Sequence, residues 1–346
     1  MTADAVAPGV APLDAVTAER VRAVETFRFT ERQARFLVEV MIHGGVFAPR
    51  QYNTFAGIVH GQKTQDFLGK LVAGGFGRAI QVGARHRGRL YHVTFKPLYA
   101  AIGEPDNRHR KPTSLGRMVQ RLMLLDAVLA DRTFTWLGTE RDKYTYFVRL
   151  LHGRVETREF PHLRFGREPL LTVRFFPDKL PIGVQADRTD HVFLYLITSA
   201  IPADFRVFLY THAEILRPLP QWTIRVLVPQ PFVESIPRFA HAAREELATP
   251  LSLSQSQELQ WWCRERHRRP ADGISPDPER ARVAAATFRS PRFRVLDRLW
   301  QQHGDPVIWS AQSAVLRDAL ERQTGRVEFL PLSHQYLHLS SLVGVA

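Results

Sequence analysis

The chain has 346 residues, of which 45% are hydrophobic and 23% charged, so it is long enough to bury a sizeable core and form two or three domains. This composition excludes a disordered, collagen-like or disulfide-stapled protein, and the single cysteine, Cys263, cannot form an internal disulfide. The net charge of +13, with 41 of the 47 basic residues being arginine, indicates an acidic partner such as nucleic acid or an anionic membrane.

The sequence does not predict export or a membrane partner. Its first residues lack the basic region of a signal peptide, and Asp14, Glu19 and Arg20 interrupt the apolar stretch that follows. The uncharged segment 192–203 is too short to cross a bilayer. We therefore expect a cytoplasmic protein, which agrees with the single cysteine.

The positive charge is concentrated near the N-terminus. Residues 28–132 contain 17 basic and 7 acidic side chains, a net charge of +10. Within this window, the stretch from His43 to Lys96 has 8 basic residues and one acid, Asp66. An ordinary solvated surface mixes both signs, so this stretch is typical of a protein that binds a phosphate backbone.

The same window has the pattern of three helices followed by a hairpin. We expect residues 1–27 to be a flexible arm. Thr30 and Gln33 form a predicted capping box at the start of the first helix, which Gly44 and Gly45 end. Further helices are predicted at about 50–56 and after Gly61, then strands at 76–82 and 89–94. This order predicts a winged helix-turn-helix domain over residues 28–102.

Such a domain places the N-terminal end of its third helix in the DNA major groove and its hairpin along the backbone. Glutamine pairs with adenine edges, and lysine and arginine pair with guanine or phosphate. The predicted DNA contacts are Arg50, Gln62, Lys63, Thr64, Gln65, Lys70, Arg78, Arg85, His86, Arg87, Arg89, Arg108, Arg110 and Lys111.

The segment from Thr30 to Ile102 resembles the winged-helix domain of the replication-relaxation family of plasmids and integrative mobile elements. The matching stretches are FTERQARFLVEVM, LGKLVAGGFGRAI and GRLYHVTFKPLYAAIG. They cover about a fifth of the chain, and many winged-helix families share them. The resemblance implies double-stranded DNA as partner, and it implies other mobile-element proteins as further partners.

Residues 103–149 are expected to form a basic linker and an amphipathic helix. The linker contains Arg108-His109-Arg110-Lys111, which suits either a phosphate clamp or a solvated connection. The helix from Thr113 to Ala130 either pairs two copies in a homodimer or docks on its own chain.

Residues 150–346 are predicted to be an α/β domain, so the fold class is α+β. Its expected strands are 170–176, 182–185, 192–198, 205–211 and 222–228. The resemblance implies a sheet similar to a restriction endonuclease. Pro177-Asp178 fits the first catalytic element of such nucleases, but the next strand supplies neither the second acid nor the lysine, so this site would be incomplete.

Other chemistry is weakly indicated. His241 and Arg244 have the spacing of a tyrosine recombinase motif, with Tyr336 downstream. Cys263 with His267, and His334 with His338, lack a third metal ligand. We expect no catalytic residue, metal or cofactor. The leading hypothesis is a DNA-binding regulator, or an accessory factor in transfer, replication or recombination, of a mobile element. The alternatives are a divergent nuclease or recombinase, and a protein-binding adaptor.

Overall fold

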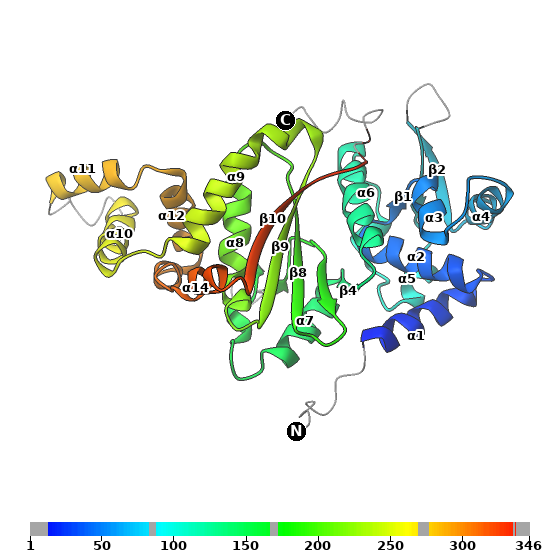
Figure 1. The fold of residues 1–346 in the computed structure, drawn as a ribbon, viewed down its shortest axis with the longest axis horizontal. Coiled ribbons are helices and arrows are strands. Elements are labelled where there is room, and N and C mark those ends of the chain that lie inside the picture. The colour runs from blue at the N-terminus through cyan, green and yellow to red at the C-terminus, as the bar shows by residue number, and fades with distance from the viewer. Residues whose placement is uncertain (1–12, 83–87, 167–171, 269–276, 335, 337–346) are drawn as a thin grey trace.

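The computed structural model describes residues 13–82, 88–166, 172–268, 277–334 and 336. They form an N-terminal block, at the right of Figure 1, which lies beside a C-terminal block built around a twisted sheet. Helices and several sheets are combined in the chain, so the predicted α+β class is confirmed. Within the described residues, no helix is both long and apolar enough to span a membrane.

The N-terminal block combines helices with a small antiparallel sheet whose strands are ordered β1-β3-β2. Its elements are α1 (Leu13–Glu25), α2 (Glu31–His43), β1 (Val46–Phe47), α3 (Pro49–Ala56), α4 (Gln62–Ala73), β2 (Gly77–Gln81), β3 (Arg89–Val93) and α5 (Lys96–Ala101). The predicted helices and hairpin strands are thus present within one or two residues of their expected ends.

Local sequence explains these elements. Thr30 and Gln33 form the predicted capping box of α2, and Gly57 ends α3 in the left-handed region at φ 63°. The core includes aromatic rings from four successive elements, which pack edge to face or stacked: Phe36, Phe47, Tyr52 and Phe67 are all buried.

The prediction of a flexible arm over residues 1–27 is wrong for residues 13–25. They form α1, whose Val21 and Val24 are buried in the N-terminal core. Arg20 of this helix donates two hydrogen bonds to Asp142, at 2.9 and 2.8 Å. The alanine-rich sequence shows only a weak amphipathic pattern, and tertiary contacts stabilise this helix. Residues 1–12 lie outside the described part.

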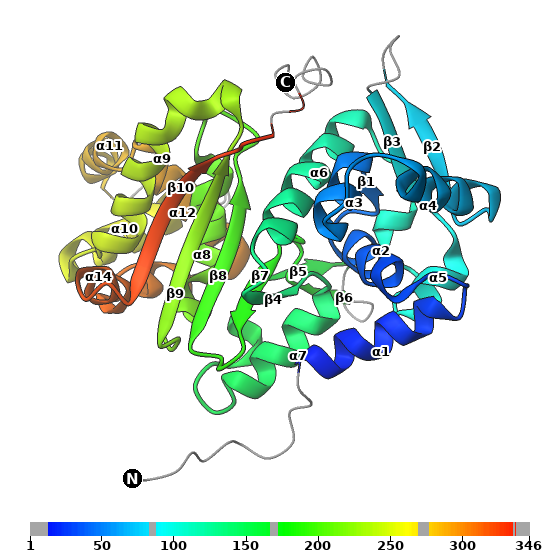
Figure 2. The ribbon, with the colours of Figure 1, turned by 45° about the vertical axis from the view of Figure 1, so that its right-hand side comes forward.

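Helix α6 (Leu115–Ala130) is the predicted amphipathic helix, and it fills the junction between the blocks (Figure 2). Its buried residues Met118, Val119 and Leu122 share one apolar cluster with Val46 and Leu90 of the N-terminal block. The same cluster contains Val192, Leu194 and Leu196 of the C-terminal sheet. Of the two roles left open by the sequence, α6 therefore docks on its own chain, and residues 103–149 are no free linker.

The C-terminal sheet has five strands in the order β10-β9-β8-β7-β4. They are β4 (Phe134–Leu137), β7 (Ile182–Gln185), β8 (Asp190–Leu196), β9 (Gln221–Val228) and β10 (Gly325–Pro331). Strand β7 is antiparallel to both neighbours, whereas β8, β9 and β10 are mutually parallel. Because β4 belongs to this sheet, the C-terminal block starts before the predicted boundary at residue 150.

One of the five predicted strands is wrong, and a second is a strand that lies outside the five-stranded sheet. Segment 205–211 is part of helix α8 (Ala203–Leu216), whose buried Phe205, Phe208, Leu209 and His212 recur at helical spacing. Segment 170–176 contributes β6 (Thr172–Phe175), which pairs with β5 (His162–Phe165) in a separate ribbon.

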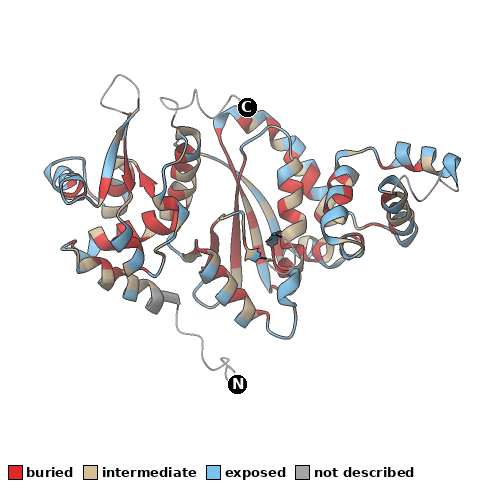
Figure 3. Cartoon of the chain, turned by 180° about the vertical axis from the view of Figure 1, so that it is seen from behind, coloured by how far each residue is buried: buried red, intermediate tan, exposed pale blue. Residues whose placement is uncertain are grey.

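Helices cover the face of the sheet opposite α6. They are α7 (Glu140–Leu150), α8 and α9 (Ile236–Ala243), which bury Phe193, Trp222 and Ile224. Figure 3 shows buried residues concentrated in the strands and in the helix faces directed towards them. The described part of the chain also contains the short 3-10 helices η2 (Arg108–Arg110), η3 (Thr157–Glu159) and η4 (Gln230–Ser235), and the π-helical turn η5 (Arg244–Ala248).

A helical lobe lies beyond α8, at the left of Figure 1. It comprises α10 (Leu253–Arg266), α11 (Pro278–Thr287), α12 (Pro291–His303) and α13 (Pro306–Ser310), and α14 (Val315–Glu321) leads from it into β10. Leu259, Cys263, Phe288 and Leu296 give the lobe a small core of its own.

Replacing Leu122 by alanine tests the role of α6 as the shared core. Leu122 is fully buried, so Leu122→Ala is expected to lower the free energy of unfolding by about 2–5 kcal/mol, measured by urea denaturation. Leu253→Ala is the matched control, because Leu253 is 65% exposed and its loss should change stability by less than about 0.5 kcal/mol. A Leu122→Ala midpoint equal to that of the control would contradict this role.

Candidate nucleic-acid interface

Helix α4 has a buried face and a solvent-exposed face. Phe67, Leu68 and Leu71 are buried in the N-terminal core. Gln62, Lys63 and Gln65 are exposed on the first turn. In Figure 1, α4 lies at the end of the N-terminal block that is farthest from the five-stranded sheet. Its first turn is therefore open to a large partner.

Polar contacts with α3 fix this first turn. The Thr64 hydroxyl donates a hydrogen bond of 2.6 Å to the Asn53 side chain. The side-chain nitrogens of Asn53 and Gln65 lie 3.3 and 3.1 Å from the two ring nitrogens of His60. These contacts set the angle between α3 and α4. Thr64 is fully buried, so its predicted contact with DNA is wrong.

The β2–β3 register divides the basic residues of the hairpin between two faces. Arg89 lies opposite Gln81, and it shares a face of β3 with Tyr91, which is buried against Phe47 on the α4 side. Arg78 lies opposite His92, on the reverse face. Both arginines are exposed, but only Arg89 faces the α4 side of the hairpin. The predicted tip residues Arg85, His86 and Arg87 lie outside the described part of the chain.

Arg50 is a predicted DNA contact that the structure assigns to an internal interaction. Its guanidinium lies 2.7 Å from Asp126 Oδ2, and it donates a 2.5 Å hydrogen bond to the Tyr336 hydroxyl. Burial disfavours the charge of Arg50, but Asp126 and Tyr336 outweigh this effect and raise its pKa. Arg50 therefore ties the C-terminal segment to α3 and α6.

Lys70 also has an internal partner. Its ammonium donates to the Arg28 carbonyl and lies 4.9 Å from the centre of the Phe29 ring. It is near the C-terminal end of α4, away from the exposed first turn. Its role is to hold the start of α2 against α4.

The basic segment 108–111 is docked and not free. His109 is buried, and burial, followed by the charge of Arg121, holds its pKa well below the usual range. Its carbonyl lies 2.7 Å from His92 Nε2, on the reverse face of the hairpin. Arg108 and Lys111 remain exposed, and Arg110 is half-buried. This segment and Arg78 thus lie on the side away from α4, so the predicted contacts form two groups.

The exposed cations on the hairpin and α4 differ from many arginines of the C-terminal block. Arg206 pairs with Glu245 and Glu246, and Arg280 lies 2.7 Å from Glu258. Among the described residues, Lys63, Arg78 and Arg89 form no ion pair. The first turn of α4 does carry one acid, Asp66, whose carboxylate accepts a 2.6 Å hydrogen bond from Gln62.

Asp178, the predicted first element of a nuclease site, lies between two buried basic side chains. Asp178 Oδ1 lies 3.6 Å from Lys143 Nζ, and Oδ2 lies 3.3 Å from His212 Nε2. Lys143 is fully buried, and burial lowers its pKa although Asp178 opposes the shift. Among the residues that the structure describes, no group of three His, Cys, Asp or Glu side chains could hold a metal. Asp178 therefore balances the buried ammonium of Lys143 and lies against the His212 ring.

The residues of the recombinase alternative do not share a site. His241 and Arg244 belong to α9 and η5, on the face of the sheet that packs against Phe193. Tyr336 belongs to the cluster on the other face, and its hydroxyl donates a 2.8 Å hydrogen bond to Asp126. Burial raises the pKa of Tyr336, which opposes a role as nucleophile.

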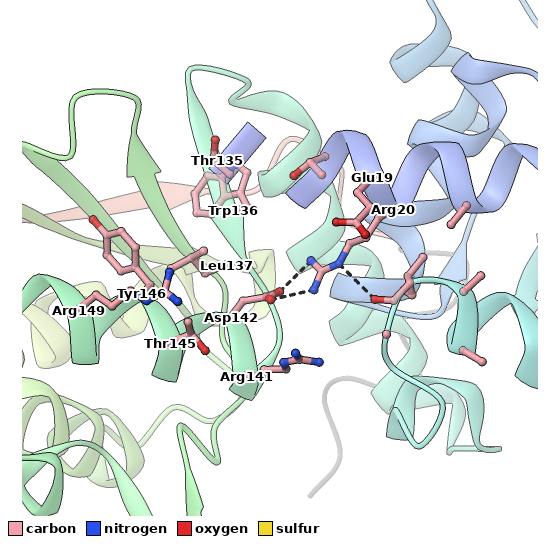
Figure 4. A pocket seen from close by; sticks show the side chains of 16 residues that line it. Glu19, Arg20, Thr135, Trp136, Leu137, Arg141, Asp142, Thr145, Tyr146 and Arg149 are labelled. Carbon is pink, nitrogen blue, oxygen red and sulfur yellow. Dashed lines mark hydrogen bonds and ion pairs between the residues drawn. The ribbon is translucent and has the colours of Figure 1, made fainter. Parts of the chain in front are cut away.

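Two cavities lie at the junction of the blocks. The first, of about 530 Å³, is lined by α1, α5, β4 and α7, and the Arg20–Asp142 ion pair crosses it (Figure 4). The second has about 510 Å³ and shares Gly103 and Arg141 with the first. Residues far apart in the sequence line both cavities, so no local pattern predicts either of them.

No family model, no characterised protein and no solved structure matches the chain. The resemblance to the replication-relaxation family therefore stays a prediction that depends on the sequence stretches themselves.

The ion pair between Asp178 and the buried Lys143 can be tested by substitution. Asp178→Asn leaves the Lys143 ammonium buried without its carboxylate, so the free energy of unfolding should fall by about 3 kcal/mol in urea denaturation. Adding Lys143→Met removes the unpaired charge and should restore most of this loss. Equal stability of Asp178→Asn and wild type would contradict the assignment.

Proposed function

We propose that this protein binds double-stranded DNA through residues 28–102, acting as a winged helix-turn-helix. The observation that carries the proposal is the exposed first turn of α4, with Gln62, Lys63 and Gln65, on the same side of the hairpin as Arg89. A helix fits the major groove, and residues of its first turn reach base edges. Arg89 and the hairpin would then follow the phosphate backbone.

The order of the elements supports this proposal. Helix α2, strand β1, helices α3 and α4 and the β2–β3 hairpin follow one another, and β1 closes the sheet beside β3. The Thr64–Asn53 hydrogen bond and the α3–α4 contacts hold the proposed recognition helix at a fixed angle. A rigid platform reduces the entropy lost when a helix enters the groove.

The sequence resemblance extends the proposal to the biological role. We propose a transcriptional regulator of a mobile genetic element, or an accessory factor in its transfer, replication or recombination. The C-terminal block would contact a second copy or another protein of the element. Its β7-β8-α8-β9 unit, antiparallel and then parallel, supports the proposed likeness to a restriction endonuclease without its chemistry. Because α6 is buried, a dimer would form through another surface.

The DNA-binding face is tested by the salt dependence of affinity. A duplex selected from a random pool should bind wild type, and Lys63→Ala or Arg89→Ala should each reduce the slope of log K against log salt by about 0.9. Fluorescence anisotropy at several chloride concentrations measures this slope. Arg298→Ala is the matched control, because Arg298 is exposed on α12, in the distant lobe, and should leave the slope unchanged.

The other outcomes separate the alternatives. If wild type shows no duplex binding at low salt, the proposal fails and the hypothesis of a protein-binding adaptor remains. Cleavage of the duplex with Mg²⁺, or a covalent adduct, would identify an enzyme. Gln65→Ala should relax base preference at one position more than it weakens overall binding, because Gln65 is placed to reach a base edge.

A further inference from the structure

The second junction cavity is bordered by both blocks. The segment 103–109 of the N-terminal block forms one wall. Thr139 and Arg141 at the start of α7, Arg174 of β6 and Lys179 form the other. Its volume of about 510 Å³ is within the range of small-molecule sites. None of its cationic side chains except Arg108 was a predicted contact, and the cavity lies apart from the exposed turn of α4.

Four cationic side chains line this cavity: Arg108, Arg141, Arg174 and Lys179. Arg174 is paired with Glu140. Within the described residues, the side chains of the other three form no ion pair or hydrogen bond. Two further acids line the cavity. Glu104 is half-buried with its carboxyl near Arg141, and Asp106 is exposed.

The surroundings of Lys179 contain an excess of positive charge. Burial lowers the pKa of Lys179 to about 8, against the attraction of Glu140. Three guanidinium groups add to this decrease, those of Arg108, Arg121 and Arg174. The backbone of Lys179 is in the left-handed region at φ 59°, which is uncommon for a residue other than glycine. The neighbouring Asp178 is anchored by Lys143 and His212, so the loop that carries Lys179 is held in place.

We infer that this cavity binds the phosphoryl group of a small molecule, with Lys179 and Arg108 as its principal ligands. Cations from separate chain segments converge there, and among the described residues three of the four form no ion pair, so a dianion would be stabilised by charge-assisted hydrogen bonds. Guanidinium groups match the geometry of phosphate oxygens, and an ammonium adds a point charge. The remaining volume accommodates the rest of such a ligand.

The cavity also has a direct route to the hairpin. Arg108 belongs to η2, and the next residue, His109, contacts His92 of β3 through its carbonyl. A ligand that draws Arg108 towards Lys179 would act on the reverse face of the hairpin. This coupling to DNA rests on the proposed function, whereas binding of the ligand does not.

Titration calorimetry with inorganic phosphate and with pyrophosphate, at constant ionic strength, tests the site. Wild type should bind one pyrophosphate per chain, and Lys179→Gln and Arg108→Gln should each weaken binding about tenfold or more. Lys111→Gln is the matched control, because Lys111 is exposed in the same segment but does not line the cavity. Thermal unfolding followed by circular dichroism confirms that each variant is folded.

Three results would overturn the inference. The first is the absence of saturable heat when wild type is titrated with pyrophosphate up to about 10 mM. The second is unchanged pyrophosphate affinity in both cavity variants. The third is a loss of pyrophosphate affinity in the Lys111→Gln control equal to that in the cavity variants.

Duplex DNA supplies phosphate groups too, and a second arm separates the two sources. If the cavity takes a small molecule, Lys179→Gln binds duplex as wild type does in the absence of pyrophosphate. A loss of duplex affinity in this variant, with pyrophosphate competing against duplex, would assign the cavity to DNA and overturn the inference. Lys63→Ala should bind pyrophosphate normally, so failure of the DNA proposal and failure of the cavity proposal give different results.

Discussion

Burial of α6 on two sides is the constraint on which the rest of the structure depends. A surface helix has one apolar stripe, whereas α6 places Leu122 in a cluster that joins both blocks and Leu125 in the N-terminal core. Its position fixes the hairpin on one side and the sheet on the other, through Leu90 and Leu194 respectively. The two blocks therefore pack as one unit along this helix, so a substitution at a buried position of α6 alters the packing of both.

The remainder of the junction has a different character. It is polar and hollow, and its contacts are ion pairs between distant segments, such as Arg20 with Asp142. The Arg50–Asp126–Tyr336 cluster closes the junction near the C-terminus. Such pairs depend on geometry and contribute less than apolar burial, so they hold the blocks in register more than they hold them together. This division leaves room for a ligand without loss of the shared core.

Local patterns predicted most of the N-terminal block, because capping residues, glycines and helical spacing act over a few residues, as with Thr30 and Gln33. Local patterns gave wrong predictions where tertiary contacts determine the secondary structure or the exposure of a residue. Phe205 and its neighbours have the composition of a strand but pack as a helix on the sheet. Thr64 resembled a DNA contact because exposure cannot be read from its spacing alone. The cavity residue Lys179 could not be found at all, since Arg108 and Arg174 approach it only in the folded chain.

The hairpin relates the two proposed sites. Because side chains alternate along a strand, β3 directs Arg89 and Tyr91 to the α4 side, and Leu90 and His92 to the side of α6 and η2. One face of the same two strands would thus follow DNA, while the other lies against the segment that lines the cavity. A shift of η2 by even a fraction of an ångström must be accommodated by the hairpin, since His92 is fully buried between them. The β2–β3 hairpin is therefore the physical element through which a bound anion would alter contact with DNA.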